Sequence, residues 1–266
     1  MTRQIISYTD AIATVIKTNN GIATTRQVLD QISKFRPLTG KTPEATILSE
    51  LGRSRRFAKI GVGVWTLAED KNNFGEINNI SFQKDLDIIS NQKKINTDDK
   101  EIVLSTERIH AQIQGMLLEI GNVNGFQTYT PNKNATFNNK PLKILSSLED
   151  IPNFTYERII RSVRYIDVLW FTNDKEPFPV FAWEVENSTN FRDGLIKFTE
   201  LNFFKTHFYF LAPETKINKF QEEISRPIFK EMKKSCDFYS MERVKQSYQS
   251  TLENEEFKIF NYDQKI

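Results

Sequence analysis

The sequence is poor in cysteine, since Cys236 is the only one among its 266 residues. A single cysteine excludes an internal disulfide and a cluster of thiolate metal ligands, and we expect it to be a small buried apolar side chain. Long apolar runs are also missing, and the first residues contain no signal-type apolar block. These absences predict a protein with no membrane span and a cytoplasmic location.

The composition is that of an ordinary globular protein, with 39% hydrophobic and 26% charged residues, and the length allows two domains. The 21 Phe fall largely after residue 120, where we expect them to fill a core. The net charge of +2 is unevenly distributed, because residues 1–69 hold ten basic and five acidic side chains. We divide the chain into a basic domain (1–69), a polar linker with room for one short helix (70–100) and a second domain (101–266).

Residues 1–69 carry the pattern of three helices followed by a β-hairpin. Ser7 and the pair Thr24-Thr25 are capping residues, and each precedes a segment with apolar side chains at helical spacing. Pro43 suits the first position of a third helix. The side chains of this helix that we expect to face inward are Ile47, Leu48 and Leu51. With a hairpin over residues 56–67, these elements make a winged helix.

The same residues resemble the HARE-HTH winged-helix family. The resemblance covers about residues 5–69 and rests on Thr39-Gly40-Lys41-Thr42-Pro43, Leu51-Gly52 and Phe57-x-x-x-Gly61-x-Gly63-x-Trp65-x-Leu67. It implies contact with DNA, including DNA with modified bases. The third helix suits a major groove, and a basic cluster beside it suits phosphates. That cluster consists of Lys41, Arg53, Arg55, Arg56 and Lys59. The alternative is a winged helix that contacts proteins and carries these residues as solvated surface.

Three carboxylates interrupt two segments that otherwise have the composition of buried strands. Asp167 precedes the apolar run 168–171, and the run 179–183 leads into Glu184-Val185-Glu186. Alternation along a strand places Glu184 and Glu186 on one face and Val185 on the other. Because ionised carboxylates in apolar surroundings need a compensating cation or donor, the trio predicts a divalent-metal site. The alternative is a set of edge-strand acids that face water.

This spacing resembles the bipartite motif of PD-(D/E)xK nucleases, with Glu186 at the position where most members have Lys. A helix and a strand before the motif and another helix and strand after it complete the α-β-β-β-α-β core of that α/β fold. We expect these four elements over residues 106–121, 126–129, 192–204 and 207–212.

The resemblance implies roles for individual residues. Asp167, Glu184 and the backbone carbonyl of Val185 would bind Mg²⁺, for which Mn²⁺ can substitute, and Glu186 would position or deprotonate the attacking water. Lys197, on the following helix, is the candidate for a migrated lysine. Arg192, on the same helix, is a candidate contact to the scissile phosphate.

The helix over residues 106–121 is expected to add a side chain to the site, as in many nucleases of this superfamily. The candidates are Gln112, Glu107 and Glu119, each of which equally suits a surface or capping role. His110 lies on the same helix, where a lone histidine more often has a structural role. A further resemblance, to predicted restriction-type nucleases, includes the segment from Glu184 to Thr189 and supports the same class.

Together the resemblances imply a Type II restriction enzyme from a bacterium or archaeon that cuts double-stranded DNA. Because cutting both strands generally calls for two active sites, a homodimer is expected. Two other classes remain open. One is a DNA-binding regulator whose nuclease fold is inactive because Glu186 has replaced Lys. The other is an interaction protein that recognises its partner through the aromatic surface of the same fold.

Overall fold

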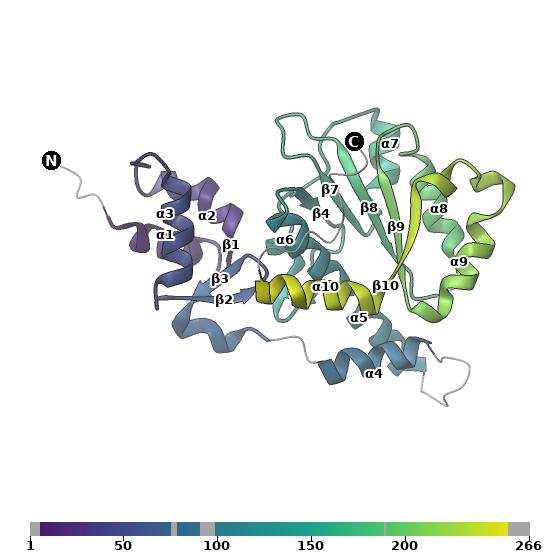
Figure 1. The fold of residues 1–266 in the computed structure, drawn as a ribbon, viewed down its shortest axis with the longest axis horizontal. Coiled ribbons are helices and arrows are strands. Elements are labelled where there is room, and N and C mark those ends of the chain that lie inside the picture. The colour runs from purple at the N-terminus through teal and green to yellow at the C-terminus, as the bar shows by residue number, and fades with distance from the viewer. Residues whose placement is uncertain (1–5, 76–78, 91–98, 189, 255–266) are drawn as a thin grey trace. The chain divides into compact units, whose positions relative to one another are not determined.

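A computed structural model describes residues 6–75, 79–90, 99–188 and 190–254 (Figure 1). The chain divides into two compact units, each of which has its own cluster of buried apolar side chains. The smaller unit holds residues 1–76 with 138–140, and the larger unit holds residues 77–137 with 141–266. Thr189, which is part of the family resemblance, and residues 255–266 of the expected second domain lie outside the described residues.

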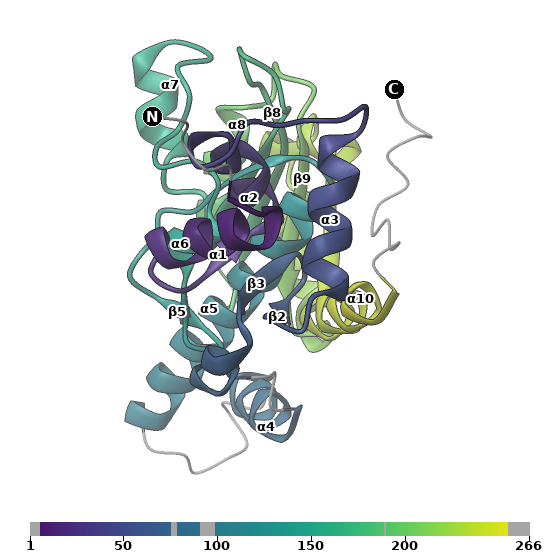
Figure 2. The same cartoon turned by 90° about the vertical axis from the view of Figure 1, so that its left-hand side faces the viewer.

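In its described residues the smaller unit contains three α-helices and a three-stranded antiparallel sheet (Figure 2). Its elements are α1 (Tyr8–Thr18), β1 (Ala23–Thr24), α2 (Thr25–Gln31), α3 (Pro43–Arg53), β2 (Phe57–Gly61) and β3 (Val64–Leu67). The strand order is β1-β3-β2. The three helices and the hairpin therefore lie at the positions expected from the sequence.

Local hydrogen bonds explain where these helices begin. The hydroxyl of Ser7 accepts from the amide of Asp10 at the start of α1. Thr24 and Gln27 form a capping box at the start of α2.

The inward face of α3 differs from the expectation at one position, because the side chain of Leu48 is 48% exposed while those of Ile47 and Leu51 are buried. Successive helical residues point about 100° apart, so a stripe through positions 47 and 51 leaves position 48 outside.

The segment expected to be a linker is structured over much of its length. A 3-10 helix covers Ala68–Asn73, and α4 covers Asn79–Ser90. The apolar side chains of α4 that are buried are Phe82, Leu86, Ile88 and Ile89. The buried carboxylate of Asp85 also forms an ion pair with Arg108 of α5 (Asp99–Val123). The one short helix that the expectation allowed thus packs against the larger unit as part of it.

The larger unit is built on a five-stranded mixed sheet with the order β10-β9-β8-β7-β4. After α5 the chain forms β4 (Gln127–Tyr129), β7 (Val168–Phe171), β8 (Pro179–Val185), α8 (Phe191–Thr199) and β9 (His207–Ala212). Strands β4, β7 and β8 are antiparallel neighbours, whereas β9 runs parallel to β8. The expected helices and strands thus occur in the order α-β-β-β-α-β when the elements between β4 and β7 are set aside. Helix α5 is longer than expected, and α8 is shorter.

Other elements surround this core. Between β4 and β7 lie β5 (Thr136–Phe137), β6 (Lys140–Pro141), α6 (Leu142–Leu145) and α7 (Glu157–Val163). After β9 lie α9 (Ile217–Ile224), β10 (Cys236–Ser240) and α10 (Met241–Asn254). Strand β10 is parallel to β9 and forms one edge of the sheet. None of the helices in the described ranges combines the length and the apolar character that crossing a bilayer requires.

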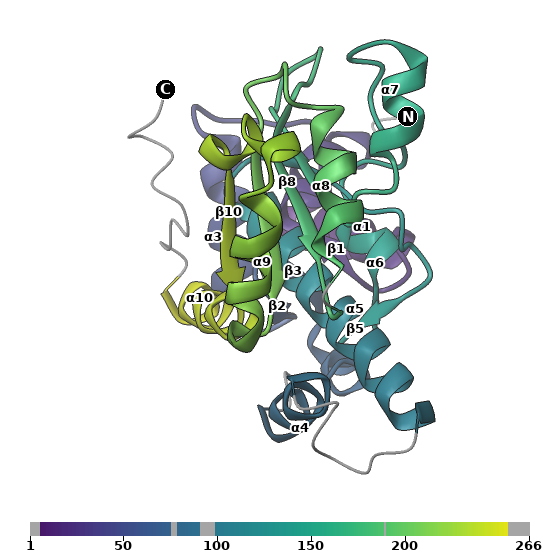
Figure 3. The same ribbon diagram turned by 90° about the vertical axis from the view of Figure 1, so that its right-hand side faces the viewer.

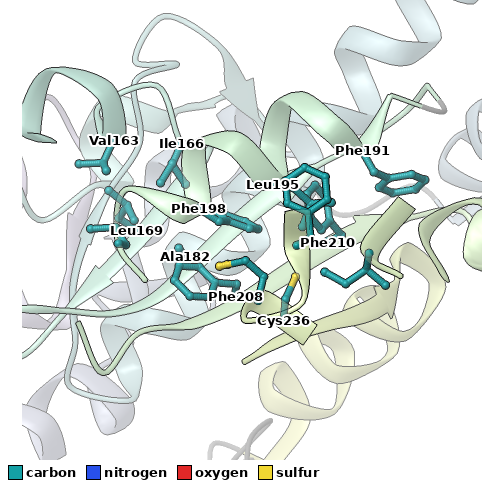
Figure 4. Packing of buried hydrophobic residues seen from close by; sticks show 14 of the residues in the cluster. Val163, Ile166, Leu169, Ala182, Phe191, Leu195, Phe198, Phe208, Phe210 and Cys236 are labelled. Carbon is teal, nitrogen blue, oxygen red and sulfur yellow. The ribbon is translucent and has the colours of Figure 1, made fainter. Parts of the chain in front are cut away.

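Helices cover both faces of the sheet, and Figure 3 shows α8 and α9 together in front of the strands. Phe198 of α8 packs with Phe208 and Phe210 of β9 in the main core, where Cys236 is also buried (Figure 4). Helix α5 covers the opposite face. It approaches so closely at Gly121 that a methyl group there would lie less than 3 Å from atoms of Trp170. The Phe-rich core confirms the expectation from composition.

Candidate active site

Asp167 and Glu184 come together because β7 begins where the antiparallel strand β8 ends. Val168, the first residue of β7, pairs with Trp183 of β8, so Asp167 lies beside the last two residues of β8. The amide of Val185 donates a hydrogen bond of 2.8 Å to Oδ2 of Asp167. The side chains of Asp167 and Glu184 are both largely buried at this edge of the sheet.

Lys197 reaches this pair of acids from α8. Its Nζ donates to Oε2 of Glu184 at 2.6 Å and to the carbonyl oxygen of Tyr165 at 3.1 Å. One turn earlier, Gly194 lets the helix lie close to the sheet, because an added Cβ would fall 2.5 Å from a ring carbon of Phe210. The structure therefore brings the migrated-lysine candidate into direct contact with one of the two expected metal ligands.

Opposing influences act on the pKa of Glu184, which is only 8% exposed. Burial raises the pKa of this carboxyl most strongly, the charge of Asp167 raises it further, and Lys197 acts in the opposite direction. The net result is a pKa of about 8, compared with an ordinary value of 4.5. Burial and the charge of Asp167 together thus favour the protonated form of Glu184 more strongly than Lys197 favours the ionised form.

Glu186 lies just beyond the end of β8, still attached to the sheet. Its amide donates to the carbonyl oxygen of Leu211 in β9 at 2.8 Å, and its Oε1 accepts from the amide of Ser188 at 2.6 Å. The charge of Glu186 raises the pKa values of Glu184 and His110. The third acid of the motif is therefore electrostatically part of the same cluster.

Two side chains of α5 contact Asp167, and both differ from the three expected candidates. His110 Nε2 lies 3.2 Å from Oδ2 of Asp167, and Gln114 Nε2 donates to Oδ1 at 3.3 Å. Burial alone would lower the pKa of His110, but the hydrogen bond and charge of Asp167 outweigh it, so the pKa is raised. The positions 110 and 114 are one turn apart, and this i,i+4 spacing is the signal that could have identified them.

The three expected α5 candidates differ in their surroundings. Glu107 is exposed and Gln112 is half-buried. Glu119 is fully buried, where its Oε2 accepts a hydrogen bond of 2.6 Å from the hydroxyl of Tyr248 in α10. Glu119 therefore has a structural partner in the C-terminal helix.

The donor chemistry of the cluster fits a hard divalent cation. Carboxylate and carbonyl oxygens are the ligands that Mg²⁺ prefers, and a cation would offset both the burial and the charge of Asp167 that raise the pKa of Glu184. In the part of the chain that the structure describes, no three acidic, histidine or cysteine side chains are already arranged as a ligand group. Oδ2 of Asp167 instead faces the amide of Val185 and the ring of His110.

Arg192, the expected phosphate contact on α8, is engaged by another carboxylate. Its Nε donates to Oε1 of Glu223 in α9 at 3.0 Å, and its side chain is 51% exposed. Because this ion pair uses Nε, a contact between Arg192 and a phosphate would have to come from the other N–H groups of the guanidinium.

The basic residues proposed for DNA contact in the smaller unit are mostly accessible. Lys41, Arg53 and Arg55 are exposed, and Lys59 is half-buried. Arg56 is exposed as well, but it forms an ion pair of 2.6 Å with Asp10. Arg53 ends α3, Arg55 and Arg56 lie in the turn between α3 and β2, and Lys59 lies on β2.

Comparisons with known proteins bear on the larger unit. The family described as the Type II restriction enzyme NmeDI C-terminal domain matches residues 87–263, which include the whole acid and lysine cluster. The Type II restriction enzyme NmeDI of Neisseria meningitidis serogroup C is 29% identical over 144 residues, which cover 50% of this chain and 40% of that enzyme. The matched part thus spans less than half of that relative. No solved structure matches the chain. Because the family match covers more than half of the sequence, the chain belongs to the NmeDI C-terminal domain family of Type II restriction enzymes.

Proposed function

We propose that this chain is a Mg²⁺-dependent endonuclease, a Type II restriction enzyme that hydrolyses phosphodiester bonds in double-stranded DNA. Membership in the NmeDI C-terminal domain family supports the class. The observation that carries the proposal is the contact of Lys197 with Glu184 beside Asp167, with Glu186 next to them. Acidic oxygens together with an ammonium group are what metal-assisted phosphodiester hydrolysis requires.

The roles of the residues follow from their placement. Asp167, Glu184 and the carbonyl of Val185 would hold Mg²⁺, or Mn²⁺ in its place, which when bound supplies charge neutralisation at the phosphate and acidifies water. Glu186 positions the attacking water and accepts its proton. Lys197 stabilises negative charge that develops on the phosphate, in the role of the lysine that most PD-(D/E)xK nucleases carry at the position of Glu186. Cleavage leaves a 5′-phosphate and a 3′-hydroxyl.

The fold of each unit supports the same proposal. The α-β-β-β-α-β order of the larger unit agrees with a PD-(D/E)xK core, here a Glu-x-Glu variant. The three helices and the hairpin of the smaller unit agree with a HARE-HTH winged helix that holds the DNA through exposed basic side chains. A homodimer would supply one active site for each strand.

Cleavage of mixed genomic DNA, methylated and unmethylated, tests the proposal. The parent chain is incubated with Mg²⁺, Mn²⁺ or a chelator, and the ends of the products are sequenced. We expect metal-dependent cutting at defined sites and its loss in Asp167→Ala and in Glu184→Ala. Glu176→Ala, which removes an exposed acid from the turn between β7 and β8, is the matched control and should cut like the parent.

Other outcomes would favour other functions. If Asp167→Ala and Glu184→Ala cut as well as the parent, the active site lies elsewhere in the chain. If the parent binds DNA and metal but cuts no substrate, the DNA-binding regulator becomes the better description, with Glu186 as the substitution that removed activity. An interaction protein would bind no nucleic acid.

A further inference from the structure

Lys216 is a buried lysine that the proposed mechanism leaves without a role. It ends the 3-10 helix Glu214–Lys216, which follows β9, and the residue is only 9% exposed. Lysine is rarely buried without a paired group, because removing an ammonium from water is costly. Its hydrogen-bond acceptor in the described part of the chain is the carbonyl oxygen of Asn187.

The sheet explains why Lys216 lies so close to the proposed site. Strands β8 and β9 are parallel, with Val185 opposite Leu211, so the segments that follow both strands leave the same edge of the sheet. Glu186 and Asn187 continue from β8, and Lys216 lies four residues beyond the end of β9. In open sheets of parallel strands this carboxyl edge is where ligands bind.

Asn187 is fixed from two sides. Its residue is buried, and its side-chain Nδ2 donates to the carbonyl oxygen of Thr106 in α5 at 3.2 Å. Its own carbonyl oxygen accepts from Lys216. The segment that carries the Glu186 carboxylate is thereby held between α5 and the turn after β9. The charge of Glu186 also acts favourably on the Lys216 ammonium, although burial lowers the pKa of that lysine overall.

We propose that Lys216 is a positioning residue of the cleavage site, whose buried ammonium holds the segment Glu186–Asn187 at the sheet edge through the Asn187 carbonyl and thereby places the Glu186 carboxylate. The proposal rests on the proposed function for the role of Glu186. Lys197 contacts the Glu184 carboxylate directly, whereas Lys216 holds the Glu186 segment through the carbonyl oxygen of Asn187. The chain would thus supply, from the turn after β9, a positive charge that the Glu-x-Glu motif itself lacks.

A double-mutant cycle tests whether Lys216 acts through Glu186. Lys216→Met, which removes the charge and keeps most of the stem, should lower kcat about 10- to 100-fold with little change in KM for DNA, because only the water-positioning step is affected. Lys216→Arg should recover most of the rate. In a Glu186→Gln background, Lys216→Met should change kcat by less than about threefold, because coupled residues are not additive. Lys219→Met, which removes an exposed lysine of α9, is the control and should behave like the parent.

Several results would overturn the proposal. An equal loss of kcat in both backgrounds would show that Lys216 acts independently of Glu186, and a change confined to KM would make it a DNA contact. If Lys216→Met fails to fold, Lys216→Gln takes its place, because its amide retains a donor for the Asn187 carbonyl without the charge. A parent-like rate in that variant would contradict the proposed role of the charge.

Hydrogen exchange separates this proposal from the proposed function. The backbone amides of residues 186–188 should exchange about tenfold faster in Lys216→Met than in the parent, with the global protection of the sheet unchanged. Lys219→Met should leave these amides as they are. If the parent cuts no DNA, the proposed function fails, yet faster exchange still supports the positioning role. Unchanged exchange at residues 186–188 refutes that role whether or not the parent cuts DNA.

Discussion

The two units place their charged side chains in opposite surroundings. In the smaller unit Arg53 and Arg55 are exposed, and the pair Arg56–Asp10 is also largely accessible to solvent. In the larger unit Glu184 and Lys216 are nearly out of contact with water, and each has a defined partner. Exposed charges act additively and are screened by salt, whereas buried charges depend on individual partners. The smaller unit is therefore suited to holding a polyanion, and the larger one to acting on a single phosphate.

The largest effect on the cleavage rate should come from breaking the ion pair between Lys197 and Glu184. Replacing Lys197 by Met removes the ammonium that contacts Glu184, and we expect the single-turnover cleavage rate to fall about 10²- to 10³-fold, the usual loss for one charge-stabilising group. Lys205→Met removes an exposed lysine and should leave the rate unchanged. A parent-like rate in Lys197→Met, together with a large loss in Glu186→Gln, would show that Glu186 alone replaces the family lysine.

Replacing one glycine in each unit by alanine should change the free energy of unfolding in opposite directions. In Gly194→Ala the new methyl group would meet Phe210 at 2.5 Å and Glu184 at 3.3 Å, so we expect the free energy of unfolding to fall by about 1–3 kcal/mol. The same change would push α8 outward and weaken cleavage through Lys197. In Gly52→Ala nothing lies within 4 Å of the added Cβ, and α3 should gain up to about 1 kcal/mol. Denaturant unfolding of both variants measures these differences, and equal effects would contradict the close packing of α8.

The part of the structure that could be predicted from the sequence depends on local signals. Capping residues locate the starts of α1 and α2, and apolar alternation locates β9 with its bounds intact. The pairing of Asp167 with Glu184 was also accessible, because the hairpin between them makes their strands neighbours. In each case the information lies within a few residues or within one hairpin.

What the sequence did not reveal depends on contacts between distant segments. Glu119, a candidate for the site, instead pairs with Tyr248, which is 129 positions away. The i,i+4 spacing places His110 and Gln114 on one face of α5, but that this face meets Asp167 depends on how α5 lies across the sheet, which no local pattern specifies. Lys216 is brought to the site by the parallel pairing of β8 and β9. The polar composition of residues 70–100 likewise allowed one short helix without locating α4, whose apolar side chains need α5 as a partner.

Removing exposed positive charges from the smaller unit should weaken DNA binding, and this effect should be smaller and should depend on the salt concentration. The double variant Arg53→Gln/Arg55→Gln should weaken DNA binding roughly tenfold at low salt and reduce the slope of log K against log[salt] by about 0.9 for each phosphate that is no longer neutralised. Lys17→Gln, an exposed charge at the end of α1, is the control. Titrations of duplex DNA at several salt concentrations provide the slopes. An unchanged slope would mean that these arginines are solvated surface and that the smaller unit contacts a protein.

The last contrast concerns how the free energy of unfolding changes with pH in the metal-free protein. Burial, and then the charge of Asp167, raises the pKa of Glu184 to about 8, so between its ordinary pKa and pH 8 the folded state binds more protons than the unfolded state. The stability linked to Glu184 is thus fully present at acid pH and is lost as the pH rises through about 8. Glu184→Gln should therefore gain stability relative to the parent between pH 5 and pH 8, measured by denaturant unfolding.

Asp10 of the smaller unit should show the opposite dependence. The hydroxyl of Ser7 and then Arg56 lower the pKa of this exposed carboxyl, so its contribution to stability is present above the ordinary pKa of an aspartate and is lost as the pH falls below it. Asp10→Asn should consequently match the pH dependence of the parent from pH 5 to pH 8 and differ from it only under more acidic conditions. If the curves of the parent and Glu184→Gln run parallel over that range, Glu184 is not as strongly perturbed by burial as the structure indicates. The contrast between Glu184 and Asp10 in the pH dependence of the free energy of unfolding would then be lost.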